Sequence, residues 1–255
     1  MIDIKKAEEE FKSYSTNYDM KESHIERKVR HTFRVVGICE KIASSIGLNE
    51  EKINLVKLIG LLHDIARFEQ YTRYKTYDDL NSIDHAELAV EILKKDNFIR
   101  RYIETEQYDD IILKSIKYHN KYAISKDVNE EEELFCKIIR DADILDIMYQ
   151  ATCETWKEII KDIEEQAISP KVYEQFIKNE LIDRNNVKND IDRVVVDIAF
   201  IYDYNFKENY KIIKENAYIN KTIERFNFKK DKTKKQMELI RKIANDYIEE
   251  QINNN

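Results

Sequence analysis

The sequence predicts an all-α protein, and three observations support that prediction. The 255 residues include only three glycines and one proline, whereas sheet proteins need turn residues at short intervals. The chain is also rich in Glu, Lys, Ile and Leu, a composition that suits helices with well-solvated faces. Finally, apolar residues recur at the three- and four-residue spacing of amphipathic helices in most segments.

Three helices are expected in the first part of the chain, at residues 3–14, 23–46 and 50–68. Ser23 and Glu26 have the spacing of a capping box, so the second of these helices should begin at Ser23. Gly47 is placed to end that helix, and Asn49 is placed to cap the third one. The third helix is apolar on nearly every side, so it belongs at the centre of the core.

Residues 69–83 are polar and aromatic and are expected to form a loop, after which Asp84 can cap a helix. Six further helices are expected, at residues 84–95, 97–121, 131–165, 170–183, 188–204 and 207–227. Pro170 stands where a helix should start. Segment 194–204 has the composition of a buried strand, but its length and surroundings favour a helix. A charged helix runs from Lys229 towards the end of the chain.

No internal repeat and no Gly-, Ser- or Pro-rich linker divides the chain. We therefore expect a helical core over residues 1–165 and a C-terminal helical extension, residues 166–255, packed on that core. The extension carries no motif with recognisable chemistry. A subunit interface is the alternative role for it, which leaves a homo-oligomer open.

Composition excludes several classes of function. The formal net charge of −7 disfavours broad binding to nucleic acid, so the basic run from Lys229 to Lys242 is interpreted as a solvated helix face. The first residues have no apolar stretch of signal-peptide type, and charges interrupt the most apolar segments, so no membrane association is expected. The three cysteines form no CxxC pair, which is typical of reduced thiols. A cytoplasmic protein is predicted.

Four of the five histidines are placed to face the protein interior. His63 and Asp64 stand side by side in the most apolar helix, and a lone dipeptide of this kind is most often a satisfied core pair. His31 and His119, however, each border an apolar helix stripe, and His85 opens a helix. Together these positions favour a shared site.

A further carboxylate comes from the segment KIIRDADILDIM. On a helical wheel, Asp146 falls within the apolar face of this segment, and Asp143 falls near the edge of that face. Four histidines and two carboxylates would thus reach one core from five helices. Buried imidazoles and carboxylates are costly when they are unpaired, and a bound cation gives all of them a partner.

This donor set predicts a transition-metal site. Imidazole nitrogen and carboxylate oxygen together suit Fe, Mn, Co, Ni or Zn better than Mg or Ca. Adjacent helix residues point about 100° apart, so Asp64 can bridge two ions while His63 binds one of them. Two ions separated by about 3.5–4 Å lower the pKa of a shared water and clamp a phosphoryl oxygen. We therefore expect one or two divalent transition-metal ions.

The order of these residues resembles the H…HD…D signature of the HD-domain superfamily of metal-dependent phosphohydrolases, with the two extra histidines of its binuclear branch. The six matching positions are His31, His63, Asp64, His85, His119 and Asp143. Segments HDIARFEQY, SIDHAELAVEIL, KYHNKY and RDADILD are similar to a group of bacterial HD proteins. The resemblance covers about residues 20–150 and implies that the predicted core is an HD-domain helical core.

The resemblance implies two metal ions that share one ligand. The first ion takes the first histidine, the HD pair and the late aspartate of the signature. Asp64 bridges to a second ion, which the two middle histidines hold. The resemblance selects Asp143 as the late aspartate, so Asp146, one turn later, would orient a ligand histidine. His85 has an alternative role as a contact to substrate phosphate, because the dipole at a helix N-terminus disfavours a cation.

The resemblance implies hydrolysis of a phosphate ester, for example that of a nucleotide, in a small phosphorylated substrate. A metal-bound hydroxide would attack phosphorus, with Asp64 holding or deprotonating it. Arg67, three residues after Asp64 on a continuing helix, can lean towards the metal and clamp the phosphate. The alternative for Arg67 is a surface salt bridge. Lys28, three residues before His31, is a weaker candidate for the same clamp.

Two other functions stay open at this point. A few members of the superfamily are di-iron oxygenases with a similar ligand set, and oxygen uptake by iron-loaded protein would distinguish them from hydrolases. The third possibility is a non-catalytic HD-fold module that binds a ligand. The complete set of six polar residues argues against such a module, which has little need for them.

Overall fold

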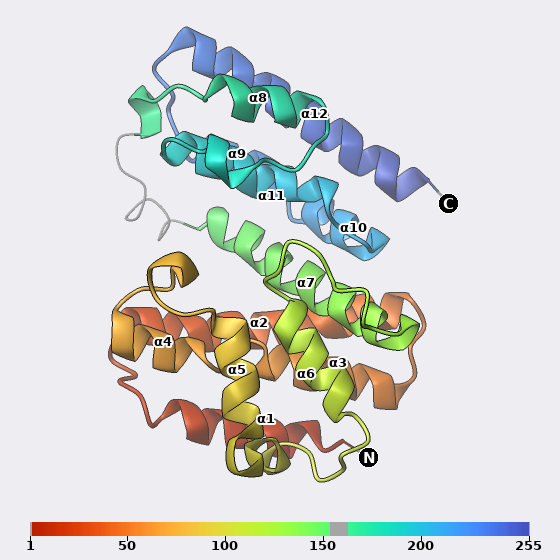
Figure 1. Ribbon diagram of the computed structural model, residues 1–255. Helices are drawn as coiled ribbons and strands as arrows, with labels where there is room; N and C mark the ends of the chain where they lie inside the picture. The colour runs from red at the N-terminus through yellow and green to blue at the C-terminus, as the bar shows by residue number, and fades with distance from the viewer. Residues whose placement is uncertain (1, 154–162, 255) are drawn as a thin grey trace. The chain divides into compact units, whose positions relative to one another are not determined.

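The computed structural model describes residues 2–153 and 163–254, and every regular element in these residues is helical (Figure 1). The α-helices are α1 (Ile4–Ser15), α2 (Ser23–Ser45), α3 (Glu50–Leu62), α4 (Arg67–Tyr74), α5 (His85–Lys94), α6 (Asp109–Tyr118), α7 (Glu130–Ala151), α8 (Pro170–Ile177), α9 (Asp190–Ala199), α10 (Lys207–Glu215), α11 (Tyr218–Glu224) and α12 (Asp231–Asn253). Short 3-10 helices are η1 (Asp79–Asn81), η2 (Lys95–Arg101), η4 (Ile163–Glu165), η5 (Arg184–Asn186) and η6 (Phe200–Tyr202). The all-α prediction is confirmed. Among the described helices, none is long and apolar enough to cross a membrane.

The chain forms two compact units, Met1–Asp143 and Ile144–Asn255. The first unit holds α1 to α6 and the first part of α7, and the second unit holds the rest of α7 and α8 to α12. The division therefore falls inside α7, whereas the sequence predicted a domain boundary between residues 165 and 166. That boundary, and the packing of residues 166–255 on the core, stay predictions.

Helices α2 and α3 pack side by side at the centre of the first unit. A glycine on α3 permits the close approach, because a Cβ atom on Gly60 would lie 3.2 Å from Cys39 Sγ and 3.4 Å from Val36 Cα. The buried side chains of α3 occupy most of its circumference, and they include Leu55, Val56, Leu58, Ile59, Leu61 and Leu62. The prediction that this helix is central is confirmed.

Local sequence features predicted several helix ends correctly. Asn49 caps α3, and Asp84 caps α5 by accepting hydrogen bonds from two backbone N–H groups. Gly47, just beyond α2, has φ +74°, a left-handed conformation that favours glycine. The capping box predicted for α2 is wrong in detail. Ser23 is the first residue of the helix, and the Glu22 side chain is its cap.

The helix predicted over residues 50–68 is interrupted. Helix α3 ends at Leu62, residues 63–66 form a turn, and α4 begins at Arg67. The loop predicted over residues 69–83 is therefore helical in its first part. Ile65 and Phe68 are fully buried. The turn after α3 allows both side chains to be buried, although the chain no longer continues along α3.

Two other predicted helices are divided. Within residues 97–121, the structure has the end of η2, a connecting segment and α6, and at the start of η2 Asp96 and Asn97 adopt φ of 51° and 57°. Within residues 207–227, α10 and α11 meet at Ala217, which has φ 53°. Residues with left-handed backbone do not continue a right-handed helix.

In the second unit, Pro170 begins α8 as predicted, although that helix ends at Ile177. Segment 194–204 is helical, since α9 is followed by η6, so the choice of helix over strand is confirmed. The helix predicted over residues 131–165 ends at Ala151, and part of that range lies outside the described residues.

Candidate metal centre

Six side chains from widely separated segments meet in the first unit. One comes from α2, two from the turn after α3, one from the start of α5, one from the residue after α6 and one from α7. They are His31, His63, Asp64, His85, His119 and Asp143. Five of them are buried, whereas the Asp143 side chain is 18% exposed. The structure therefore brings together every residue that the sequence predicted as a metal ligand.

The turn after α3 fixes the orientation of the His63 ring. His63 Nδ1 lies 2.7 Å from the carbonyl oxygen of Gly60. A carbonyl oxygen only accepts hydrogen bonds, so Nδ1 carries the ring proton and Nε2 presents a lone pair. That Nε2 atom is fully buried and has no hydrogen-bond partner. An uncompensated buried acceptor costs about 1–3 kcal/mol, which a cation at this position would recover.

His119 and His85 each present an Nε2 lone pair as well. His119 Nδ1 donates to the carbonyl oxygen of Ile116 at 2.6 Å, and His85 Nδ1 donates to Asp79 Oδ2, also at 2.6 Å. Burial, together with the neighbouring His85 and His63, lowers the pKa of His119 to about 3. Burial, and then Arg67, also lower the pKa of His85.

The two rings meet through their Nε2 atoms, which are 2.9 Å apart. Because each ring carries its proton on Nδ1, both Nε2 atoms are acceptors, and no proton is left to join them. Two lone pairs facing each other at this distance repel unless a cation lies beside both. The donor chemistry of His85 and His119 therefore fits a bound metal ion.

Asp64 lies between the two pairs of histidines. Its Oδ2 atom is 3.4 Å from His31 Nε2 and 3.6 Å from His63 Nε2. Its Oδ1 atom is 3.4 Å from His85 Nε2 and 3.8 Å from His119 Nε2. Each carboxylate oxygen thus faces a different pair, which is the arrangement that a bridging ligand requires.

The late aspartate that approaches the histidines is Asp143. Its Oδ1 atom is 3.2 Å from His31 Nε2 and 3.8 Å from His63 Nε2. Burial alone would raise the pKa of Asp143, but the approach of the His31 and His63 rings holds the pKa well below its usual range. Asp146 is fully buried and accepts a hydrogen bond from Gln150 at 2.9 Å.

These groups have the spacing of a metal coordination sphere. Three overlapping triads have their ligand atoms within 4.8 Å of one another, and they are His31, His63 and Asp64; His63, His119 and Asp143; and Asp64, His85 and His119. Ligands about 2.0–2.2 Å from one ion stand about 3–3.6 Å apart. The observed contacts are near this range, so the clusters can hold a divalent metal.

Two cations flank the bridging carboxylate. Lys28 Nζ lies 2.6 Å from Asp64 Oδ2, and Arg67 Nε lies 3.3 Å from Asp64 Oδ1. Burial alone would raise the pKa of Asp64, but Lys28, His63 and Arg67 hold it well below its usual range. Arg67 reaches this position from the first residue of α4, not from a continuing helix.

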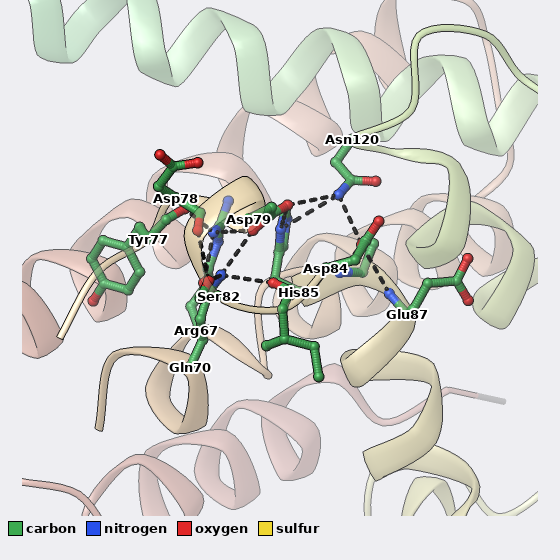
Figure 2. Close-up of polar contacts among 12 residues, drawn as sticks. Arg67, Gln70, Tyr77, Asp78, Asp79, Ser82, Asp84, His85, Glu87 and Asn120 are labelled. Atoms are coloured by element: carbon green, nitrogen blue, oxygen red, sulfur yellow. Dashed lines mark hydrogen bonds and ion pairs between the residues drawn. The ribbon is translucent and has the colours of Figure 1, made fainter. Parts of the chain in front are cut away.

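Sequence reasoning missed a hydrogen-bond network beside the metal centre (Figure 2). Asp79 Oδ1 accepts from Arg67 Nη1 at 3.0 Å and from Gln70 Nε2 at 2.8 Å. Asp79 Oδ2 accepts from His85 Nδ1 at 2.6 Å and from Asn120 Nδ2 at 3.1 Å. One carboxylate therefore joins Arg67 to His85. No periodicity marks Asp79, and the only signal for it is an acid six residues before a candidate ligand.

A family model described as HD domain matches residues 29–148. All six residues of the candidate metal centre lie within this range, as do Arg67 and Asp79. The match identifies residues 29–148 as an HD domain. Neither a curated protein nor a solved structure matches the chain.

Proposed function

We propose that this protein is a metal-dependent phosphohydrolase that cleaves a phosphate ester of a small molecule such as a nucleotide. The observation that carries the proposal is the approach of the His85 and His119 Nε2 lone pairs to 2.9 Å beside Asp64. A cation beside both nitrogens satisfies that arrangement. The HD-domain match supports the choice of reaction, because HD domains are generally phosphohydrolases.

Two groups of residues would hold two divalent ions, each of them Fe, Mn, Co, Ni or Zn. One ion would take His31, His63, Asp64 and Asp143, and the other would take Asp64 and the two histidines of the second pair, His85 and His119. Ions bound there lower the pKa of a coordinated water and stabilise charge on a phosphoryl oxygen. His85 Nε2 faces Asp64 and His119, which favours metal binding over phosphate contact for His85.

The remaining chemistry belongs to side chains around the ions. Asp64 stays ionised beside Lys28 and Arg67, so it can accept a hydrogen bond, or a proton, from the attacking water. Arg67 is the phosphate clamp, through Nη2, the nitrogen not used in the contacts with Asp64 and Asp79. Lys28, on the other side of Asp64, adds positive charge for the same phosphate.

The proposal also covers the class of substrate, the location and the oligomeric state. The net charge of −7 favours a small phosphorylated substrate over nucleic acid as the partner. We also propose a cytoplasmic location, and a homo-oligomer formed through residues 166–255 as one role for that segment.

The experiment that tests the function combines metal analysis with a screen of activity. Purified protein, loaded in turn with Mn²⁺, Fe²⁺, Co²⁺, Ni²⁺ or Zn²⁺, is assayed for release of phosphate from nucleotides and small phosphoesters. We expect release that requires metal and that disappears in the Asp64→Ala variant. An iron-loaded protein that releases no phosphate but consumes oxygen would instead be an HD-type oxygenase. A protein that binds no metal would be a ligand-binding module.

A further inference from the structure

A second cluster of acidic and imidazole groups lies next to the candidate metal centre. Asp79, Asp84 and His85 have ligand atoms within 4.8 Å of one another, so the cluster resembles a third metal site. The donors around it argue otherwise. Asp84 accepts from two backbone N–H groups, from Asn120 and from Lys121, leaving both of its oxygens already engaged.

Asp79 is engaged in the same way, through four N–H donors on its two oxygens. A cation placed here would have to displace Arg67 and the amide groups of Gln70 and Asn120. The cluster is therefore a network of hydrogen bonds and not a further metal site. Its members lie on both sides of His85, as Figure 2 shows.

We propose that Asp79 is a positioning residue, which prepares His85 to bind metal and holds Arg67 beside Asp64. This inference rests on the proposed function, because it assumes that His85 is a ligand. Asp79 itself touches neither the ions nor the substrate in this scheme. It acts through the two residues that its carboxylate joins.

The position of His85 in the fold explains why it needs a side-chain partner. His63 and His119 follow the last turns of α3 and α6, and each donates to the carbonyl oxygen three residues earlier, on Gly60 and Ile116. His85 is the first residue of α5, so no earlier turn of the same helix supplies such a carbonyl. The carboxylate of Asp79, 2.6 Å from His85 Nδ1, takes that place.

The carboxylate also changes the electrostatics at the start of α5. The N-terminus of a helix carries partial positive charge, which disfavours a cation bound to its first residue. The Asp79 carboxylate accepts from four N–H donors, which include the Arg67 guanidinium and the His85 ring. A carboxylate in this place offsets the helix dipole and makes the His85 ring a stronger ligand.

The second oxygen of Asp79 fixes Arg67. Arg67 Nη1 donates to Asp79 Oδ1 at 3.0 Å, to Gln70 Oε1 at 2.7 Å and to the carbonyl oxygen of Tyr77 at 2.8 Å. These contacts hold the guanidinium while its Nε stays on Asp64. Gln70 also donates to Ser82 Oγ, which anchors the loop before α5 to α4.

The test is the Asp79→Asn variant, studied with Mn²⁺ alone by equilibrium dialysis and elemental analysis. The asparagine oxygen can still accept from Arg67 and Gln70, but its NH₂ group then faces His85 Nδ1. Two donors cannot share a hydrogen bond, so the ring proton should move to Nε2 and block the metal. We expect affinity for the second Mn²⁺ to fall about 10–100-fold, while the first Mn²⁺ binds as in wild type.

Two further variants separate positioning from a role in folding. Asp78→Asn makes the same change at an exposed neighbour, which contacts the Leu80 N–H and Asn81, and it should leave both affinities unchanged. Asp79→Glu keeps an acceptor for His85 and should bind the second ion more tightly than Asp79→Asn. Thermal unfolding is measured for each protein.

The outcomes distinguish this inference from the proposed function. Wild-type protein that binds no Mn²⁺ overturns both, whereas wild-type protein that binds a single Mn²⁺ overturns only this inference. Equal affinity of wild type and Asp79→Asn for the second Mn²⁺ overturns only the role of Asp79. The third outcome is that Asp79→Asn lowers stability and weakens both ions in parallel, and that Asp79→Glu behaves in the same way. This outcome would mean that Asp79 stabilises the loop, and it overturns the inference as well.

Discussion

At the scale of single residues, one hydrogen bond on each of three rings decides which histidine nitrogen faces the proposed ions. For His63 and His119 the acceptor is a backbone carbonyl three residues earlier. For His85 the acceptor is the side chain of Asp79. Backbone acceptors survive any side-chain substitution, whereas the acceptor for His85 can be removed. A single substitution outside the ligand set, at Asp79, should therefore weaken the second metal position.

Substitutions of Asp64 and His85 should differ in the number of bound ions that they affect. Asp64 faces both histidine pairs, at 3.4 Å from His31 and 3.4 Å from His85, so Asp64→Ala should lose both ions and all metal-dependent turnover. His85→Ala should weaken only the second ion. Elemental analysis of the purified variants measures this. Equal metal content in wild type and Asp64→Ala would show that the assignment is wrong.

The two late aspartates should also behave differently. Asp143 lies 3.2 Å from His31 Nε2, so Asp143→Asn should abolish metal-dependent turnover. Asp146→Asn should reduce turnover only partly, by about 10–100-fold, as changes that act through a ligand do. Circular dichroism should show that both variants are folded. A larger loss for Asp146→Asn than for Asp143→Asn would reverse the assignment.

A buried acid in the second unit predicts a pH-dependent stability. Asp197 on α9 is buried, and its Oδ2 makes no hydrogen bond. Burial raises the pKa of Asp197 to about 7 from its usual 3.8, against the opposing charges of Arg184 and Arg193. The folded protein thus keeps a proton that the unfolded chain releases, so stability falls as pH rises from about 4 to about 7 and then levels off.

Asp197→Asn removes that pH dependence. The difference of about 3 pKa units sets an upper bound of about 4 kcal/mol, so the variant should be more stable than wild type by about 2–4 kcal/mol at pH 8. The advantage should shrink towards pH 4. Urea unfolding at both pH values measures the change. A variant no more stable than wild type at pH 8 would mean that Asp197 is ionised in the folded state without cost.

At the scale of elements, local signals predicted the helices and their caps, and packing decided the rest. Asn49, Asp84 and Pro170 marked helix starts because a cap or a proline acts on its own backbone. The turn after α3 carries no such signal, because Ile65 and Phe68 become buried only through contacts across the fold. The six ligand positions were predicted from the order of the motif, but the role of Asp79 depends on a loop with no periodic pattern.

The close packing of α2 against α3 can be tested with a pair of glycines. An alanine Cβ at Gly60 would lie 3.4 Å from the Val36 backbone, and overpacking of this kind costs about 1–3 kcal/mol. Alanine gains about 1 kcal/mol in helix propensity, so Gly60→Ala should lower the free energy of unfolding by up to about 2 kcal/mol.

Gly37→Ala is the matched control. Gly37 is also helical, but nothing lies within 4 Å of an added Cβ there, so this variant should gain up to about 1 kcal/mol. Urea unfolding of both variants measures the pair. A Gly60→Ala protein as stable as Gly37→Ala would show that α2 and α3 can separate slightly without cost.

At the scale of the whole molecule, the candidate metal centre is a property of the folded first unit. Its six groups come from residues 31 to 143, so no short segment holds enough of them. The unfolded chain cannot present this set, and metal binding therefore adds to the stability of the fold.

Metal should raise the unfolding temperature, and the gain in stability grows with the logarithm of the ratio of free metal to the dissociation constant. At a free Mn²⁺ concentration 100 times the dissociation constant, the gain is about 2.7 kcal/mol. Differential scanning calorimetry with Mn²⁺ and with a chelator measures the shift for wild type, and Asp64→Ala serves as the control that should not respond. An identical response from wild type and the variant would point to metal bound elsewhere.

The place of Asp143 in α7, at the end of the first unit, has a consequence for biosynthesis. The ribosome adds about 5–20 residues per second, so Asp143 is added about 6–22 s after His31, from which it is 112 residues distant along the chain (143 minus 31). During that interval the nascent chain gains the other three ligand histidines before it has the last carboxylate. An ion captured then would meet a nitrogen-rich partial site, and the ligand set that discriminates between metals is complete only after α7 has been synthesised.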